Sequence, residues 1–182
     1  AANNAIGSFV IAYFLAYGTK YVGYERTDVL GASLVASAFW LASTLYFGKL
    51  SDRVGRKRTF IIGYIALAIW CVPMWLLVDT GSIAMFYLAV IVTGALLGPT
   101  YGPMCALFAE MFPVKVRLSG VSIGYAIGSI IGGAFAPMIA EILYTTFNTS
   151  MAIATYSVAI SLISLIGVLM VPKGIQDKDL HV

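Results

Sequence analysis

The sequence contains few charged residues, few cysteines and almost no histidine. Aspartate, glutamate, lysine and arginine make up 10% of the 182 residues, whereas 60% of the residues are hydrophobic. Because a soluble domain carries about 25% charged residues, this composition excludes a largely water-exposed surface and indicates an integral membrane protein. The two cysteines, Cys71 and Cys105, stand inside apolar runs, which favours ordinary packing roles over a disulfide framework or a zinc site.

The residue patterns of catalytic and nucleic-acid-binding sites are missing as well. The sequence pairs no nucleophile with a base and clusters no metal ligands, and its one histidine, His181, stands in the polar tail. We therefore expect neither an enzyme nor a bound metal or organic cofactor. The net charge of +3 is divided among short segments, so nucleic acid is not an expected partner. The expected partner is the lipid bilayer.

Six long apolar runs fill most of the chain. About 20 apolar residues span a bilayer core as a helix, and the runs are continuous rather than alternating, which favours helices over a barrel. The sequence therefore predicts an all-α membrane protein. The predicted bundle occupies residues 1–171, with spans at about 5–23, 29–47, 59–78, 83–109, 118–140 and 151–171, and residues 172–182 form a polar tail.

The basic residues are distributed unequally between the two sides of this bundle. Nine would lie on one side, namely Lys49, Arg53, Arg56, Lys57, Arg58, Lys115, Arg117, Lys173 and Lys178. Only Lys20 and Arg26 would lie on the other. Because short cytoplasmic loops are enriched in lysine and arginine, we expect both ends of this segment and the tail to be cytoplasmic. The expected location is the cell membrane, which in a bacterium is the inner membrane.

Charged residues are absent from the middles of all six predicted spans. Lys20, Asp79, Glu110 and Glu141 all stand close to span ends, where a long side chain can stay hydrated. Since intramembrane carboxylates and histidines are the usual proton carriers, the sequence shows no proton relay within this segment.

Residues 48–58, the basic segment, form the densest group of charges. Gly48 and Gly55 permit a tight turn and a close approach of helices. The carboxylate of Asp52 could bind Arg56 or lie at the N-terminus of a neighbouring helix, where free amide hydrogens favour an anion. The alternative is an ordinary basic loop in which Asp52 has no special role.

The fifth predicted span carries four glycines at four-residue spacing. These are Gly120, Gly124, Gly128 and Gly132. Small residues at this spacing let two membrane helices approach closely. The face could pack permanently against a neighbour, or it could be a smooth surface on which a partner helix moves.

The fourth predicted span is interrupted by Gly98-Pro99 and by Gly102-Pro103. Proline removes a helical hydrogen bond, so this helix should kink or unwind there. Exposed backbone is tolerated at membrane depth where protein or a watery cavity satisfies it, so the site could line a cavity or be a structural kink. The hydroxyl of Tyr101 could reach a substrate in such a cavity.

Polar residues also mark one face of the first predicted span. Asn4, Tyr13 and Tyr17 could line a polar cavity, but packing or interfacial roles for the two tyrosines are equally compatible with the sequence.

The basic segment resembles a known signature. The run Gly48-Lys49-Leu50-Ser51-Asp52-Arg53-Val54-Gly55-Arg56-Lys57 resembles the loop that follows the second helix of each half of major facilitator superfamily transporters. A second stretch resembles the region around helices ten and eleven of the metabolite:proton symporters, which include shikimate, dicarboxylate and proline/betaine type carriers. It comprises Tyr101-Gly102-Pro103, residues 108–117, Ser119-Gly120 and Gly124-Tyr125, and it places this chain in the C-terminal half.

The resemblance implies one six-helix half of a twelve-helix fold that moves a small organic acid or zwitterionic osmolyte with protons by alternating access. It implies a cavity lined by Asn4, Tyr13, Tyr17, Tyr101 and Met104, and a cytoplasmic latch containing Gly48, Asp52, Arg53, Gly55, Arg56, Glu110 and Arg117. The glycine face of the fifth span would meet a helix of the missing N-terminal half. The abrupt start of the chain without methionine also suggests a truncated chain.

Two alternatives remain open at this stage. A six-helix channel of the water and glycerol type needs two Asn-Pro-Ala loops, whereas residues 3–5 read Asn-Asn-Ala and no second copy exists. The other alternative is a nonfunctional truncated half whose apolar interface is left uncovered.

Overall fold

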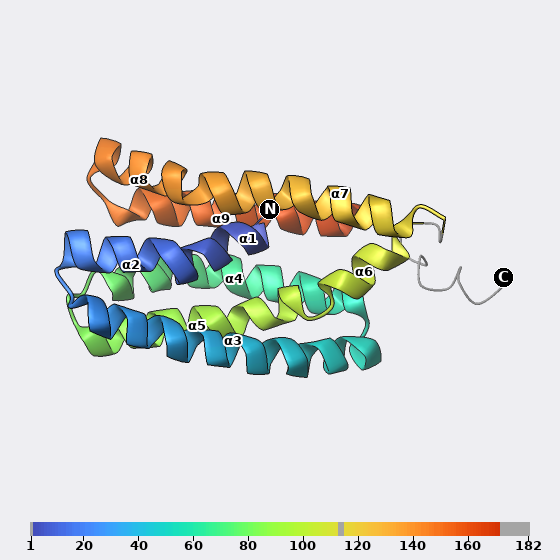
Figure 1. The fold of residues 1–182 in the computed structure, drawn as a ribbon, viewed down its shortest axis with the longest axis horizontal. Coiled ribbons are helices and arrows are strands. Elements are labelled where there is room, and N and C mark those ends of the chain that lie inside the picture. The colour runs from blue at the N-terminus through green and yellow to red at the C-terminus, as the bar shows by residue number, and fades with distance from the viewer. Residues whose placement is uncertain (1, 113–114, 172–182) are drawn as a thin grey trace.

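The computed structural model describes residues 2–112 and 115–171, which form a bundle of six long helices (Figure 1). The first long helix consists of α1 (Ala2–Ser8), η1 (Phe9–Tyr13), α2 (Phe14–Tyr17) and η2 (Gly18–Val22), where η marks a π-helical turn. The second and third are α3 (Arg26–Val54) and α4 (Arg56–Val78). The fourth consists of α5 (Ile83–Tyr101) and α6 (Met104–Glu110). The fifth consists of α7 (Arg117–Ser129), η3 (Ile130–Ala134) and α8 (Phe135–Phe147), and the sixth is α9 (Ser150–Met170).

All six helices are long and apolar enough to cross a membrane, and the described ranges contain no strand. This confirms the predicted all-α membrane fold. The predicted tail, residues 172–182, lies outside the described residues.

Two segments that the sequence predicts to be loops between helices are helical in the structure, wholly or in part. The basic segment is not a loop, because α3 continues through Val54 and α4 begins at Arg56. Its 29 residues make α3 about 43 Å long, longer than a hydrocarbon core of about 30 Å, so the charged end can extend beyond the core. The loop predicted to begin after residue 140 begins later in the structure, because α8 continues to Phe147.

The connections alternate between the two ends of the bundle (Figure 1). The α3–α4 junction, the end of α6 and the start of α7 lie at one end, which we call the basic end. The turns from η2 to α3, from α4 to α5 and from α8 to α9 lie at the opposite end.

Glycine allows α3 and α5 to lie very close together. A Cβ atom at Gly94 would stand 2.5 Å from the carbonyl oxygen of Ala36, and one at Gly102 would stand 2.6 Å from the amide nitrogen of Gly48. Such contacts between small residues are the usual means by which membrane helices approach. Gly48 thus lies at a close approach of two helices, within α3 rather than in a turn.

An aromatic cluster fills the core between the first long helix and α4. The fully buried indole of Trp75 has its ring centroid 5.2 Å from that of Tyr17, 5.4 Å from that of Phe14 and 6.1 Å from that of Tyr13. Because aromatic rings contribute large contact areas and favour such tilted arrangements, this cluster holds the first long helix against α4.

Candidate functional site

Three acidic and basic side chains meet at the basic end of the bundle and form a charge cluster of Asp52, Arg56 and Glu110. The chain reverses direction at Gly55, whose φ of 104° is readily adopted only by glycine. Arg56 Nη2 lies 3.1 Å from Asp52 Oδ1, and Arg56 Nη1 forms an ion pair with Glu110 Oε1. A hollow of about 400 Å³ is lined by these three residues together with Ser51 and Gly55.

The other residues of the predicted latch lie near the charge cluster in the fold. Arg53 is exposed in the last turn of α3, and Gly48 lies against Gly102. Arg117 begins α7, and its Nε donates to the carbonyl oxygen of Phe112 at 3.4 Å. The structure thus joins Asp52 and Glu110 through Arg56 and places the remaining residues at the same end of the bundle.

Two adjoining hollows between the helices share Trp40 and Tyr101, and together we call them the central hollow. The larger has a volume of about 570 Å³ and is lined by Ser37, Trp40, Leu41, Thr44, Tyr101, Met104, Cys105, Phe108, Val121 and Tyr125. The smaller has a volume of about 270 Å³ and is lined by Asn4, Gly7, Ser8, Ile11, Ala12, Trp40, Tyr101, Ser129 and Gly133.

Hydrogen bonds order the polar side of the central hollow. The Tyr101 hydroxyl donates to Asn4 Oδ1 at 3.0 Å, and Asn4 Nδ2 donates to Ser129 Oγ at 2.9 Å. The Trp40 and Tyr101 rings stand edge to face with centroids 5.0 Å apart. The hydroxyl of Thr44, which also lines the hollow, is buried without a hydrogen-bond partner.

The lining residues of the central hollow carry no charge. Aromatic and aliphatic side chains predominate, with a few hydroxyl and amide groups. This is the usual construction of a small-molecule pocket, in which apolar walls bind the body of the ligand and a few polar groups orient it. Within residues 2–112 and 115–171, no group of three side chains could hold a metal ion.

Of the five residues expected to line a cavity, three line the central hollow and two do not. Asn4, Tyr101 and Met104 line the central hollow. Tyr13 and Tyr17 do not, because their side chains are 4% and 2% exposed and pack on Trp75. The packing alternative therefore describes Tyr13 better, whereas Tyr17 packs on Trp75 and also lines a separate polar hollow at the end opposite the charge cluster. Trp40, Thr44 and Tyr125 were missed, since nothing in a uniformly apolar helix shows which face borders a hollow.

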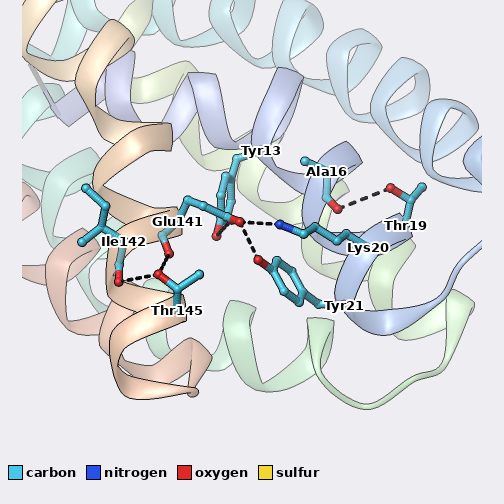
Figure 2. A network of polar contacts seen from close by, with 8 residues as sticks. All are labelled: Tyr13, Ala16, Thr19, Lys20, Tyr21, Glu141, Ile142 and Thr145. Atoms are coloured by element: carbon cyan, nitrogen blue, oxygen red, sulfur yellow. Dashed lines mark hydrogen bonds and ion pairs between the residues drawn. The ribbon is translucent and has the colours of Figure 1, made fainter.

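A second polar region, at the end opposite the charge cluster, was also missed. Glu141 accepts hydrogen bonds from Tyr13, Lys20 and Tyr21 (Figure 2), and these four residues form the Glu141 network. Nearby, Asp79 accepts hydrogen bonds from the hydroxyls of Tyr17, at 2.6 Å, and Ser150. The opposite charges of Lys20 and Glu141 at the same end of two spans were the available signal.

The predicted glycine face of the fifth helix is partly open. A Cβ atom at Gly124 would meet no heavy atom within 4 Å, whereas one at Gly120 would stand 2.5 Å from Phe112 Cδ1. Gly128 is half-buried and Gly132 is buried. The face is thus covered by this chain at its ends and free at Gly124.

Six membrane-length helices, four of which line a ligand-sized hollow, define a multi-pass membrane protein, and the comparisons with known proteins give its family. The chain belongs to the Major Facilitator Superfamily, whose family model matches residues 1–179. Its named relatives below are transport proteins, which are not enzymes.

Three relatives illustrate the similarity. A protein of Haemophilus influenzae, provisionally named a metabolite transport protein, is 31% identical over 96% of this chain and 44% of its own length. The shikimate transporter of Escherichia coli is 29% identical over 88% of this chain and 37% of its own length. An inner membrane metabolite transport protein of Escherichia coli is 29% identical over 82% of this chain and 34% of its own length. The chain therefore spans less than half the length of these relatives.

Proposed function

We propose that this chain forms one half of a secondary active transporter that carries a small organic metabolite together with protons by alternating access. The observation that carries the proposal is the membership of residues 1–179 in the Major Facilitator Superfamily. The central hollow supports it, because its volume and its mixed apolar and polar lining suit a metabolite-sized ligand.

The proposed cargo is an organic acid or a zwitterionic osmolyte. The names of the relatives, which include a shikimate transporter and proline/betaine transporters, support this class. The central hollow carries no charge of its own, so the charged groups of the cargo would be bound by side chains from outside this segment.

We further propose that six additional helices complete the transporter as an N-terminal half. The relatives are more than twice as long as the part of them that this chain matches. The open glycine face at Gly124 suits the close approach of another helix. A nonfunctional truncated half remains the alternative for the isolated polypeptide.

The proposed location is the cell membrane of a bacterium, with the basic end of the bundle in the cytoplasm. Seven of the basic residues of the chain stand in residues 49–58 and 115–117. Enrichment of lysine and arginine in short cytoplasmic connections is the physical basis of this orientation. Cysteine labelling from either side of the membrane tests it, and labelling of an introduced Arg53→Cys from the periplasmic side would contradict it.

Uptake in membrane vesicles tests the transport proposal. The complete gene product is supplied with radiolabelled shikimate or glycine betaine, with and without an imposed inward proton gradient. Accumulation that depends on the gradient and collapses with a protonophore is expected for at least one of the two probes, and empty-vector vesicles are the control. Saturable uptake that does not respond to the gradient would overturn the coupling. Equal uptake by vesicles containing residues 1–182 alone would overturn the need for a second half.

A further inference from the structure

The Glu141 network joins the first and fifth long helices at the end opposite the charge cluster. One carboxylate accepts from three donors on the first helix: Lys20 Nζ at 2.7 Å and the Tyr21 hydroxyl at 2.5 Å, both to Oε1, and the Tyr13 hydroxyl at 3.4 Å, to Oε2. Figure 2 shows the three side chains converging on Glu141. A single residue of α8 therefore contacts both π-helical turns of the first long helix, η1 through Tyr13 and η2 through Lys20 and Tyr21.

Glu141 lies inside a helix rather than at its end. Because α8 continues to Phe147, about 9 Å of helix lies beyond Glu141. Less than two turns from the end of a membrane-length helix, an ionisable side chain can reach the polar edge of the membrane, and it is tolerated best where it is also paired. The pairing with Lys20 and the two tyrosine hydroxyls explains how the carboxylate is tolerated there.

The segment held by Glu141 is one of two π-helical turns in the first long helix. Lys20 and Tyr21 belong to η2, a π-helical turn over Gly18–Val22, and the next residue, Gly23, has a φ of 85°. Turns of this kind interrupt regular helices and are frequent at functional sites. A π-helical turn followed directly by a glycine allows η2 to change direction once its side-chain contacts are lost.

The residues just before η2 are held in a different way. Tyr13 and Tyr17 pack on the buried indole of Trp75, with ring centroids 6.1 Å and 5.2 Å from it. This aromatic contact does not depend on Glu141. Loss of the Glu141 network should therefore loosen η2, which keeps the ring contact of Tyr21 with Tyr144 on α8, while the preceding turns stay in place.

The network is exposed enough to open and close. The side chains of Lys20 and Glu141 are 62% and 36% exposed, so water screens their attraction. Ion pairs of this exposure add little to stability. The contact can therefore position η2 in one state and be broken in another without a large change in the fold.

A hollow of about 400 Å³ lies beside the network, and we call it the polar hollow. Tyr21 and Val22 of η2 line it together with Tyr144 of α8 and with Tyr17, Asp79, Gly81, Asn148, Thr149 and Ser150. The hollow thus has η2 on one side and α8 on the other. A movement of η2 away from α8 would widen it.

We propose that Glu141 is a positioning residue that holds η2 against α8, and that breaking the Glu141 network widens the polar hollow. In a transporter this movement changes access at the end opposite the charge cluster. That consequence rests on the proposed function, whereas the movement itself follows from the contacts of η2.

The test measures the labelling of a cysteine in η2 by a membrane-impermeant maleimide, using the complete protein in membranes. All native cysteines of the complete protein are replaced, with Cys71→Ser and Cys105→Ser in this segment, and Val22→Cys introduces the reporter in the polar hollow. Adding Glu141→Gln should speed labelling of the reporter about five-fold, the factor expected for the loss of a contact of this strength. Lys20→Met should act in the same direction.

Two matched variants make the result specific. Thr80→Cys, an exposed position on the turn after α4 at the same end of the bundle, should be labelled at an unchanged rate. Combining Lys20→Glu with Glu141→Lys exchanges the two charges and should restore slow labelling of the η2 reporter. An unchanged rate at residue 22 in Glu141→Gln would overturn the proposal. An equal acceleration at residues 22 and 80 would also overturn it, because the variant would then have loosened the whole end.

The labelling assay requires no substrate, so it separates this proposal from the proposed function. If uptake fails to respond to a proton gradient while Glu141→Gln still exposes residue 22, the positioning role stands and the coupling does not. If uptake is proton-coupled but the labelling rate is unchanged, the proton coupling stands and the positioning role of Glu141 does not.

Discussion

Arg56, the first residue of α4, forms an ion pair with Glu110, the last residue of α6. The pair connects the α3–α4 junction to the short helix that follows the break at Gly102 and Pro103. Arg56 also contacts Asp52 one helical turn earlier, at 3.1 Å. The guanidinium of Arg56 is therefore shared between a partly buried carboxylate on another helix and an exposed one beside it.

Asp52→Asn should sharply lower transport while leaving folding intact. The carboxylate of Asp52 is 61% exposed, and an exposed pair of this kind contributes about 0–1 kcal/mol to stability. A large loss of uptake would therefore reflect a contact made in another state of the transport cycle. Uptake by the complete transporter and its thermal unfolding in detergent are the two measurements. Uptake at the wild-type rate would refute a gating role for Asp52.

Glu110→Gln should destabilise the basic end of the bundle more than Asp52→Asn does. The side chains of Glu110 and Arg56 are 17% and 26% exposed, so loss of the carboxylate leaves a partly buried guanidinium with a weaker partner. We expect a loss of about 2 kcal/mol, between the values for exposed and buried pairs. Unfolding by denaturant in detergent measures it, and equal stabilities of the two variants would contradict the expected order.

Gly102→Ala should destabilise the packing of α3 on α5, whereas Gly124→Ala should not affect the bundle. A Cβ atom at residue 102 would stand 2.6 Å from the amide nitrogen of Gly48 and 2.8 Å from the carbonyl oxygen of Thr44, both backbone atoms that cannot easily move. Overpacking of this kind costs about 1–3 kcal/mol. Thermal unfolding of the two variants provides a matched comparison, because the same methyl group is added at a crowded and at an open position.

Gly124 also tests whether this face packs against the proposed second half. A bulkier Gly124→Leu has free space within this chain, so it should leave the six-helix bundle folded but reduce the amount of correctly assembled complete transporter. Normal assembly of the Gly124→Leu protein would show that this face does not pack against the other half.

Cys105 should react with a small maleimide while Cys71 should not. Cys105 is exposed and lines the central hollow, whereas Cys71 is buried at 1% exposure. A transported substrate bound in the central hollow should slow the reaction of Cys105. Mass spectrometry of the labelled protein identifies the modified residue, with Cys105→Ser as the control. Unaltered labelling in the presence of saturating substrate would place the binding site elsewhere.

The Asn4 contacts show how far sequence reasoning reached into the candidate site. Asn4 and Tyr101 were both expected at a cavity, and the structure joins them by a hydrogen bond of 3.0 Å beside the central hollow. Tyr13 and Tyr17 carried the same sequence signal, yet they turn toward Trp75. The ring of a tyrosine in an apolar helix packs on other side chains, and its hydroxyl needs one hydrogen-bond acceptor. The local sequence does not show where that acceptor lies.

The sequence by itself determined the membrane class, the six helices and the position of the charged segments, because composition and the lengths of apolar runs are properties of the chain alone. Only the tertiary structure decided that Arg56 lies between Asp52 and Glu110 and that Lys20 meets Glu141. The Lys20–Glu141 contact joins residues 121 positions apart, so it depends on which helix faces lie together. In uniformly apolar helices those faces are chosen by close packing at small residues, as at Gly94 and Gly102, rather than by any polar pattern along the chain.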